Sequence, residues 1–168
     1  DCGSGNKSNV GEKILIPFLQ YQGIGKVDGI FLSHPDSDHI NGVLQIIQSK
    51  DVKIGKIILP NYEGAEAAFA ELLQYVPAKQ VAYVSAGMQF AEEGERLTCL
   101  HPSKAYRTSE DNEASACYFL EMDGRSVLFT GDVSAEQEKA VLEALERQCD
   151  VSVDVLKVAH HGSRFSTS

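Results

Sequence analysis

The sequence predicts an α/β protein in which helices cover sheets of strands. Short apolar runs of strand length, such as residues 27–32, alternate with segments whose apolar residues recur at helical spacing, such as residues 40–47. Asp123 and Gly124 separate two further apolar runs, which is a strong hairpin signal. These observations together indicate an α/β (α+β) fold.

The elements can be placed in chain order. Apolar residues at helical spacing predict a helix over residues 12–22, which glycines then end. A second helix carries apolar residues 40–47, Pro77 stops a third over residues 67–76, and Ser134 with Gln137 forms a capping box for a fourth that carries Leu145. The predicted strands span residues 27–32, 56–59, 81–84, 96–100, 118–120, 127–129 and 153–159, and a polar loop covers residues 101–114.

Length and composition are those of a globular protein. The 168 residues are enough to bury one core, and no linker divides them, so we expect one domain over residues 1–168. The abrupt start suggests that an upstream part has been trimmed. No stretch approaches the ~20 apolar residues of a membrane span, and no signal peptide is recognisable.

Charge and cysteine usage narrow the function classes. A formal net charge of -9 argues against a general nucleic-acid-coating protein, although metal ions can supply positive charge locally for a phosphodiester substrate. The four cysteines, which show no C-x-x-C spacing, are Cys2, Cys99, Cys117 and Cys149. A thiolate zinc site is therefore not expected.

Residues 33–39, with the sequence SHPDSDH, place four metal-capable side chains between a buried strand and a helix. In an extended segment residues two apart point the same way, so His34, Asp36 and Asp38 can converge. His39 is expected to turn away at the helix start, which suits ligands shared between two ions. The alternative is an Asp-rich helix cap with incidental histidines, but a cap needs only one such residue.

Two more strands end in metal-capable residues. Asp132 follows the second strand of the hairpin, and His160 with His161 follows the last strand. Gly-Asp alone is ordinary turn chemistry, and an isolated histidine is more often packed or solvated. Three strand ends that carry such residues predict a site assembled from distant segments.

The motifs SHPDSDH (33–39), NEAS (112–115), LFTGD (128–132) and LKVAHHGS (156–163) resemble the metallo-β-lactamase superfamily. Within it, they are most similar to the hydrolase-like domain of ComEC-type competence proteins. The resemblance implies an αββα sandwich that here lacks terminal elements, so that the domain over residues 1–168 is partial at both ends. It also implies that Asp1, in an early D-x-G motif, supports the ligands without binding metal.

The resemblance implies two divalent ions, Mn²⁺ or Zn²⁺, and distributes their ligands over the chain. The implied ligands are His34, Asp36 and Asp111 for one ion and Asp38, His39 and His160 for the other, with Asp132 bridging both. Asp111 with Asn112 stands where the superfamily carries a third histidine. His101 could substitute, but we expect an ordinary turn there. Asp36 in place of the usual histidine should favour manganese over zinc.

The implied activity is a phosphodiesterase or nuclease that cleaves single-stranded DNA during DNA uptake. Asp38, Asp132 and His161 are the expected catalytic residues, and Asn112, His161 and Ser163 are expected near substrate or behind the ligands. The longer protein is expected to contain a membrane channel, with this segment as a soluble, extracytoplasmic part at the cell membrane. Alternatives are a small-ester or thioester hydrolase of the glyoxalase or lactonase kind, and a catalytically silent domain that binds DNA or a partner.

Overall fold

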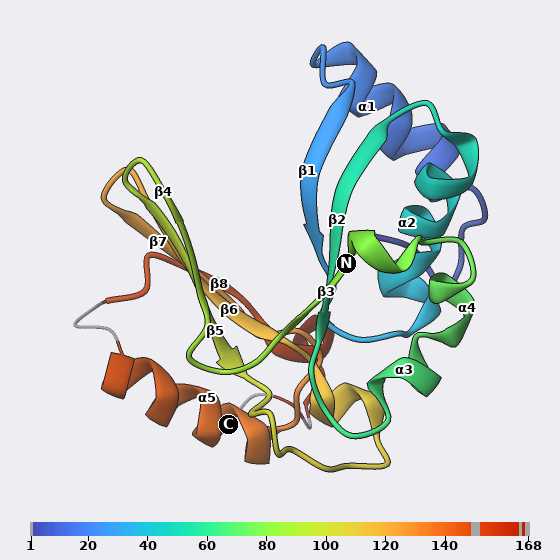
Figure 1. Cartoon of the computed structure of the whole chain (residues 1–168). Coiled ribbons are helices and arrows are strands. Elements are labelled where there is room, and N and C mark those ends of the chain that lie inside the picture. The colour runs from blue at the N-terminus through green and yellow to red at the C-terminus, as the bar shows by residue number, and fades with distance from the viewer. Residues whose placement is uncertain (1, 149–151, 165, 167–168) are drawn as a thin grey trace. The chain divides into compact units, whose positions relative to one another are not determined.

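The computed structural model describes residues 2–148, 152–164 and 166, which form two compact units (Figure 1). Asp1 and Cys149, both considered above, lie outside the described residues. The mixture of sheets and helices confirms the predicted α/β class. Among the described residues, every helix is too short or too polar to cross a membrane.

The first unit comprises Asp1–Leu59 and Gly64–Tyr83 and contains a sheet of order β1-β2-β3. Strands β1 and β2 run parallel, with Lys26 opposite Lys53 and Phe31 opposite Ile58. The element bounds are η1 (Gly11–Leu15), α1 (Ile16–Tyr21), β1 (Lys26–Phe31), α2 (Ser37–Ser49), β2 (Lys53–Pro60), α3 (Ala65–Ala68), α4 (Ala70–Leu73), η2 (Ala78–Gln80) and β3 (Val81–Val84).

Helices α1 and α2 cover one face of β1 and β2, as Figure 1 shows. Ile16 of α1 and Ile46 of α2 are buried together with Val52, and Val27 and Ile54 of the two strands pack against them. The apolar spacing of the sequence therefore produces an ordinary helix-on-sheet core in this unit.

The second unit comprises Pro60–Glu63 and Val84–Ser168 and contains a sheet of order β4-β5-β6-β7-β8. Neighbouring strands are antiparallel, except that β7 and β8 are parallel. Its elements are β4 (Gln89–Glu92), β5 (Glu95–His101), η3 (Asp111–Ala114), β6 (Cys117–Met122), β7 (Arg125–Phe129), α5 (Ala135–Gln148), β8 (Val155–Lys157) and η4 (Ala159–Gly162).

Helix α5 lies along this sheet (Figure 1). Val141 and Leu145 of the helix are buried in one cluster with Leu100 and Phe119 of the strands. Cys117 belongs to the same cluster, which agrees with its interpretation as a small buried hydrophobe.

Several sequence predictions need correction. The helix expected over residues 67–76 is two short helices, α3 and α4, that meet at Phe69, whose backbone leaves the helical region (φ -92, ψ 15). Strand β4 was not predicted, because all four of its residues are exposed and give no buried pattern. The last strand, expected to run to residue 159, ends at Lys157, and η4 follows.

Candidate metal centre

The two units each carry one group of the predicted site residues. The His34 cluster, in the first unit, comprises Ser33, His34, Asp36, Asp38 and His39. The Asp132 cluster, in the second unit, comprises Asp132, Lys157, His160 and His161.

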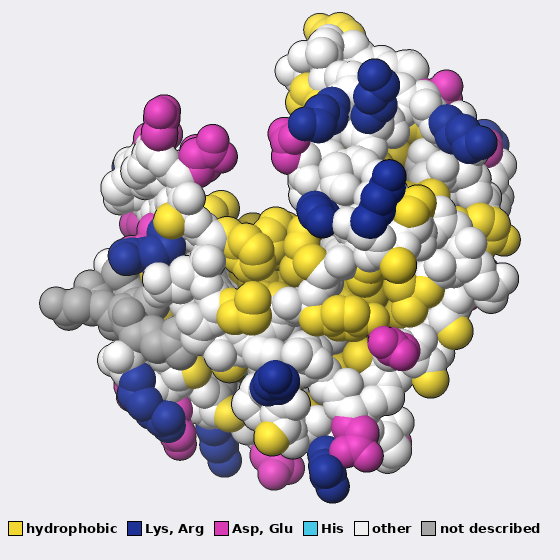
Figure 2. All heavy atoms as spheres, in the orientation of Figure 1, with side chains coloured by type: hydrophobic (Ala, Val, Ile, Leu, Met, Phe, Trp, Pro, Cys, Tyr) yellow, Lys and Arg dark blue, Asp and Glu magenta, His cyan; other side chains and the backbone are white. Residues whose placement is uncertain are grey.

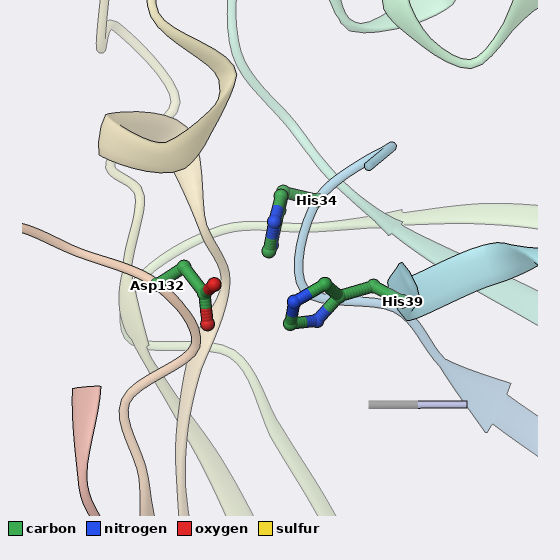
Figure 3. Close-up of side chains that lie close together, drawn as sticks. All are labelled: His34, His39 and Asp132. Atoms are coloured by element: carbon green, nitrogen blue, oxygen red, sulfur yellow. The ribbon is translucent and has the colours of Figure 1, made fainter. Parts of the chain in front are cut away.

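The His34 cluster occupies the connection between β1 and α2. His34 is 0% exposed and His39 is 2% exposed. Their ring centroids lie 3.9 Å apart, and each ring offers a nitrogen within 4.8 Å of one on the other ring (Figure 3). Two buried imidazoles whose nitrogens approach this closely form a natural pair of ligands for a borderline cation.

This ring contact corrects one expectation. His39 was predicted to turn away from His34 at the start of the helix. Helix α2 already begins at Ser37, so its first turn carries His39 back beside His34. The assignment of the two histidines to different ions stays a prediction.

Ser33, which the sequence analysis left without a role, contacts both rings. Its Oγ lies 3.1 Å from Nδ1 of His34 and 3.4 Å from Nδ1 of His39. A hydroxyl oxygen has two lone pairs and can accept a hydrogen from each Nδ1–H. In that tautomer both Nε2 atoms keep their lone pairs for a metal ion, which is how ligating histidines are usually oriented. In the sequence, the signal for this role of Ser33 was its position directly before the first histidine.

The two carboxylates of the cluster extend toward the same imidazoles. Asp36 Oδ2 lies 3.7 Å from His34 Nε2, and Asp38 Oδ2 lies 3.8 Å from His39 Nε2. Asp36 occupies the N-cap position of α2, but it makes no side-chain capping hydrogen bond to the described helix. The geometry therefore gives little support to the alternative of a simple Asp cap.

The N-terminal segment holds the first turn of α2 in place. The Cys2 amide donates to the His39 carbonyl at 3.1 Å, and the Gly42 amide donates to the Cys2 carbonyl at 2.9 Å. A Cβ at Gly42 would lie only 2.1 Å from that Cys2 carbonyl oxygen, so no larger residue fits without displacing the backbone. This segment thus fixes the helix start that carries two predicted ligands.

Asp132 lies in the loop after β7 and is 4% exposed (Figure 3). Its amide donates to Ser115 Oγ at 3.1 Å. Lys157 Nζ lies 3.2 Å from Asp132 Oδ1, and His161 Nε2 lies 3.3 Å from Oδ2. The structure therefore brings Asp132 and His161 together, as a shared site requires, and adds Lys157, to which the sequence analysis assigned no role.

His160 and His161 have backbones in the left-handed region, with φ of 46° and 54°. Such values cost free energy in residues that carry a Cβ, and strain of this kind often accompanies functional sites. The His160 amide donates to the Gly131 carbonyl at 3.1 Å, which ties η4 to the loop that bears Asp132. The Ser163 amide in turn donates to the His160 carbonyl at 2.9 Å.

Asp111 and Asn112 lie in η3, away from the end of a strand. Asp111 Oδ1 accepts a hydrogen bond of 3.0 Å from the Tyr62 hydroxyl. His101 is buried with its Nε2 2.8 Å from the Glu113 carbonyl oxygen, and burial lowers the pKa of its imidazole. His101 thus has a structural partner. That Asp111 is the third ligand of the ion assigned to His34 and Asp36 remains a prediction.

Comparison with known proteins identifies the family of the chain. The model of the metallo-beta-lactamase superfamily matches residues 1–168. The chain belongs to the metallo-beta-lactamase superfamily. It therefore has the hydrolase-like fold of a superfamily that binds divalent metals, and the predicted sandwich class is confirmed.

Curated relatives narrow the family further. The chain is 34% identical over 161 residues to ComE operon protein 3 of Bacillus subtilis, covering 95% of this chain and 20% of that protein. It is 31% identical over 170 residues to Recombination protein 2 of Haemophilus influenzae, covering 100% of this chain and 19% of that protein. The predicted resemblance to ComEC-type competence proteins is confirmed, and the chain spans about a fifth of these relatives' length.

Solved structures share the fold at low identity. The MIM-2 metallo-beta-lactamase matches with a TM-score of 0.57 and 16% identity, covering 96% of this chain and 64% of that one. CmlA, a diiron beta-hydroxylase from Streptomyces venezuelae, matches with a TM-score of 0.55 and 15% identity, covering 79% of this chain and 25% of that one. At such identities the likeness concerns the fold alone.

Proposed function

We propose that the chain is a metal-dependent phosphodiesterase that cleaves single-stranded DNA, with the His34 and Asp132 clusters acting as two halves of one centre. The observation that carries this proposal is the pair of buried imidazoles, His34 and His39, whose Nδ1 atoms share the Ser33 hydroxyl. Family membership across all 168 residues supports the joining of the two clusters.

The residues present fit two divalent ions. The donor set combines imidazole nitrogens with carboxylate oxygens, which suit zinc or manganese. The proposed ligands are His34, Asp36, Asp38, His39, Asp132, His160 and Asp111. When bound, a pair of divalent ions activates a water and stabilises the charge of a phosphoryl transition state.

The protein's own groups then have distinct tasks. Ser33 orients two imidazoles, and Asp132 is held in place through its amide by Ser115. Asp38, with a partly exposed carboxylate, is proposed to handle the proton of the attacking water. His161, about half exposed, is proposed to contact the phosphate or the leaving oxygen.

A group of lysines on the first unit supports a phosphodiester substrate over a small ester. Figure 2 shows basic side chains gathered over β1 and β2. Lys26 and Lys53 are exposed register partners on these strands, and Lys26 also pairs with Asp28. Lys56 is exposed as well and donates to the carbonyl of exposed Lys79 at 2.7 Å. Like charges placed opposite each other destabilise a sheet, so a polyanion is the partner that such a surface fits.

The decisive test combines metal content, measured by plasma mass spectrometry, with cleavage of single-stranded DNA at equal occupancy of manganese or zinc. We expect bound metal, DNA cleavage and higher activity with manganese. A metal-loaded protein that hydrolyses thioesters or lactones and leaves DNA intact would favour the small-ester alternative. A protein that binds DNA without metal and without cleavage would favour the silent binding domain.

The lysine surface can be tested separately. The double variant Lys26→Gln/Lys53→Gln should bind single-stranded DNA about 10-fold more weakly at low salt. Hydrolysis of a small chromogenic phosphodiester should not change, because that substrate does not reach the lysines. Lys104→Gln, an exposed charge removed elsewhere, is the matched control. Equal effects of the two changes on DNA affinity would contradict a specific role for this surface.

We propose that the chain is part of a longer protein that includes a membrane channel through which DNA passes, as its resemblance to ComEC-type proteins implies. One relative is named competence protein ComA, from Neisseria gonorrhoeae, and that name supports a role in competence.

A further inference from the structure

Lys157 is the last residue of β8, directly beside the loop that carries Asp132. Its ammonium Nζ donates to the Gly131 carbonyl at 2.9 Å and to Asp132 Oδ1 at 3.2 Å. Its own backbone is fixed as well, because Thr130 Oγ1 donates to the Lys157 carbonyl at 2.7 Å. The side chain is only 26% exposed, so the ammonium is held by the fold and is not a freely solvated surface charge.

Asp132 needs such a partner in the absence of metal. A carboxylate that is 4% exposed loses most of its hydration, and an ionised group in that position is costly unless a cation or hydrogen-bond donors compensate it. Lys157 supplies a full positive charge at Oδ1, and the Gly131 carbonyl holds that charge in position. The pair therefore stabilises the ionised carboxylate before any ion arrives.

The two oxygens of Asp132 are not equivalent. Oδ1 contacts the Lys157 ammonium, whereas Oδ2 lies 3.3 Å from His161 Nε2. A carboxylate can bridge two ions through one oxygen or through both. An ion that binds Oδ2 can leave Lys157 in place, but an ion that binds Oδ1 has to displace a cation anchored by the neighbouring carbonyl.

We propose that Lys157 is an internal counter-cation that competes with the second metal ion for Asp132. If ions occupied the centre, one could bind near Oδ2 with Lys157 in place, whereas a further ion would meet the charge of the ammonium at Oδ1. The competition rests on the proposed metal-dependent function, whereas the Lys157–Asp132 coupling in the metal-free protein does not. The centre would then fill in two steps of unequal affinity.

The test for competition is titration of the full chain with Mn²⁺ by isothermal calorimetry, comparing wild type with Lys157→Gln. The wild type should show a tight and a weak step. The variant should bind the second ion about 10-fold more tightly, because one competing positive charge is gone. Lys157→Arg keeps the charge and should keep the weak second step. Lys139→Gln removes an exposed charge from the same unit and should change neither step.

The metal-free protein provides a second, independent readout. Lys157→Gln should lower Tm by about 4 °C, because it leaves a buried carboxylate without its cation. In the background Asp132→Asn the same change should have much less effect, and this non-additivity measures the coupling.

Two results would overturn the proposal. One is a Lys157→Gln variant that binds the second ion no more tightly than Lys139→Gln does, or that binds both ions more weakly. The other is strict additivity of the two changes in the metal-free protein. If the wild type binds no divalent ion at all, the proposed function fails and the competition with it, while the Tm cycle still decides whether Lys157 is the counter-cation of Asp132.

Discussion

The two clusters differ in how the chain builds them. The His34 cluster arises from a single connection of a few residues between β1 and α2, where both imidazoles and both carboxylates follow one another in sequence. The Asp132 cluster draws on the loop after β7, the end of β8 and the turn η4, with Ser115 behind it. Local geometry thus sets one cluster, whereas sheet pairing assembles the other.

This difference also appears in charge and strain. The histidines of the His34 cluster are oriented by one neutral hydroxyl, and no residue from 33 to 39 has a positive φ. The Asp132 cluster contains a buried carboxylate with a lysine against one oxygen, and two consecutive histidines with positive φ. We infer that the His34 cluster provides the rigid nitrogen ligands, while the Asp132 cluster sets how many ions bind.

The largest expected effect comes from Asp38, the proposed catalytic residue of the His34 cluster. Asp38→Asn keeps the shape but removes a charge and a proton acceptor, so single-stranded DNA cleavage should fall about 10²–10⁴-fold. The loss should persist over about pH 6–9, the range around the pKa of water bound to a divalent ion. Cleavage rates with metal content verified provide the measurement. Full activity of the loaded variant would remove Asp38 from the mechanism.

The two serines offer a matched pair, one in each cluster. Ser33→Ala removes the oxygen shared by both Nδ1 atoms, so the affinity for the first ion should fall about 10–100-fold, and stability should fall because two buried rings lose their acceptor. Metal affinity by calorimetry and Tm of the metal-free protein separate the two effects. A variant that loses stability but keeps its metal affinity would show that Ser33 is structural.

Ser115→Ala should lower stability with less effect on metal affinity. It leaves the buried Asp132 amide without its acceptor, which costs about 1–3 kcal/mol of the free energy of unfolding. Affinity for the first ion should fall less than in Ser33→Ala, because Lys157 still holds the carboxylate. Denaturant unfolding gives the free energy of unfolding, and a parallel metal titration gives the affinity for the first ion. If the two serine variants behaved alike, the division of labour between the clusters would be wrong.

The smallest effect concerns His101, the histidine outside both clusters. Burial lowers its pKa in the folded protein below the ordinary value near 6.5, so the unfolded chain takes up its proton first as the pH falls. Its contribution to stability is therefore complete above that ordinary value and is lost as the pH drops below it. The wild type should lose more stability than His101→Gln between about pH 7.5 and about pH 5. Metal binding at neutral pH should be the same in both proteins, and a loss of metal in the variant would make His101 a ligand.

The contrast between the His34 and Asp132 clusters also explains how much of the site could be predicted from the sequence. The motif at residues 33–39 needs only a strand end and a helix start, and both are recognisable from local periodicity. The ring contact between His34 and His39 was not predicted, because it depends on the helix starting at Ser37. Lys157 was missed because its partner lies 25 positions earlier and meets it only through the parallel pairing of β7 and β8.

The fold shows a similar limit. Helix positions with a buried stripe and the hairpin at Asp123 and Gly124 were predicted, since their signals are local. Strand β4 was missed because its four residues are exposed and form a strand only by pairing with β5. The break at Phe69 inside an apolar helical pattern was likewise invisible, because the spacing of apolar residues continues through it.

The most direct test of the central claim is an anomalous-scattering crystal structure of the full chain soaked in Mn²⁺ or Zn²⁺. If the two clusters form one centre, an ion should lie about 2.0–2.2 Å from Nε2 of His34 or His39 and also contact the Asp132 carboxylate. Ions found separately on the two clusters, or at another place such as the cysteines, would contradict the account.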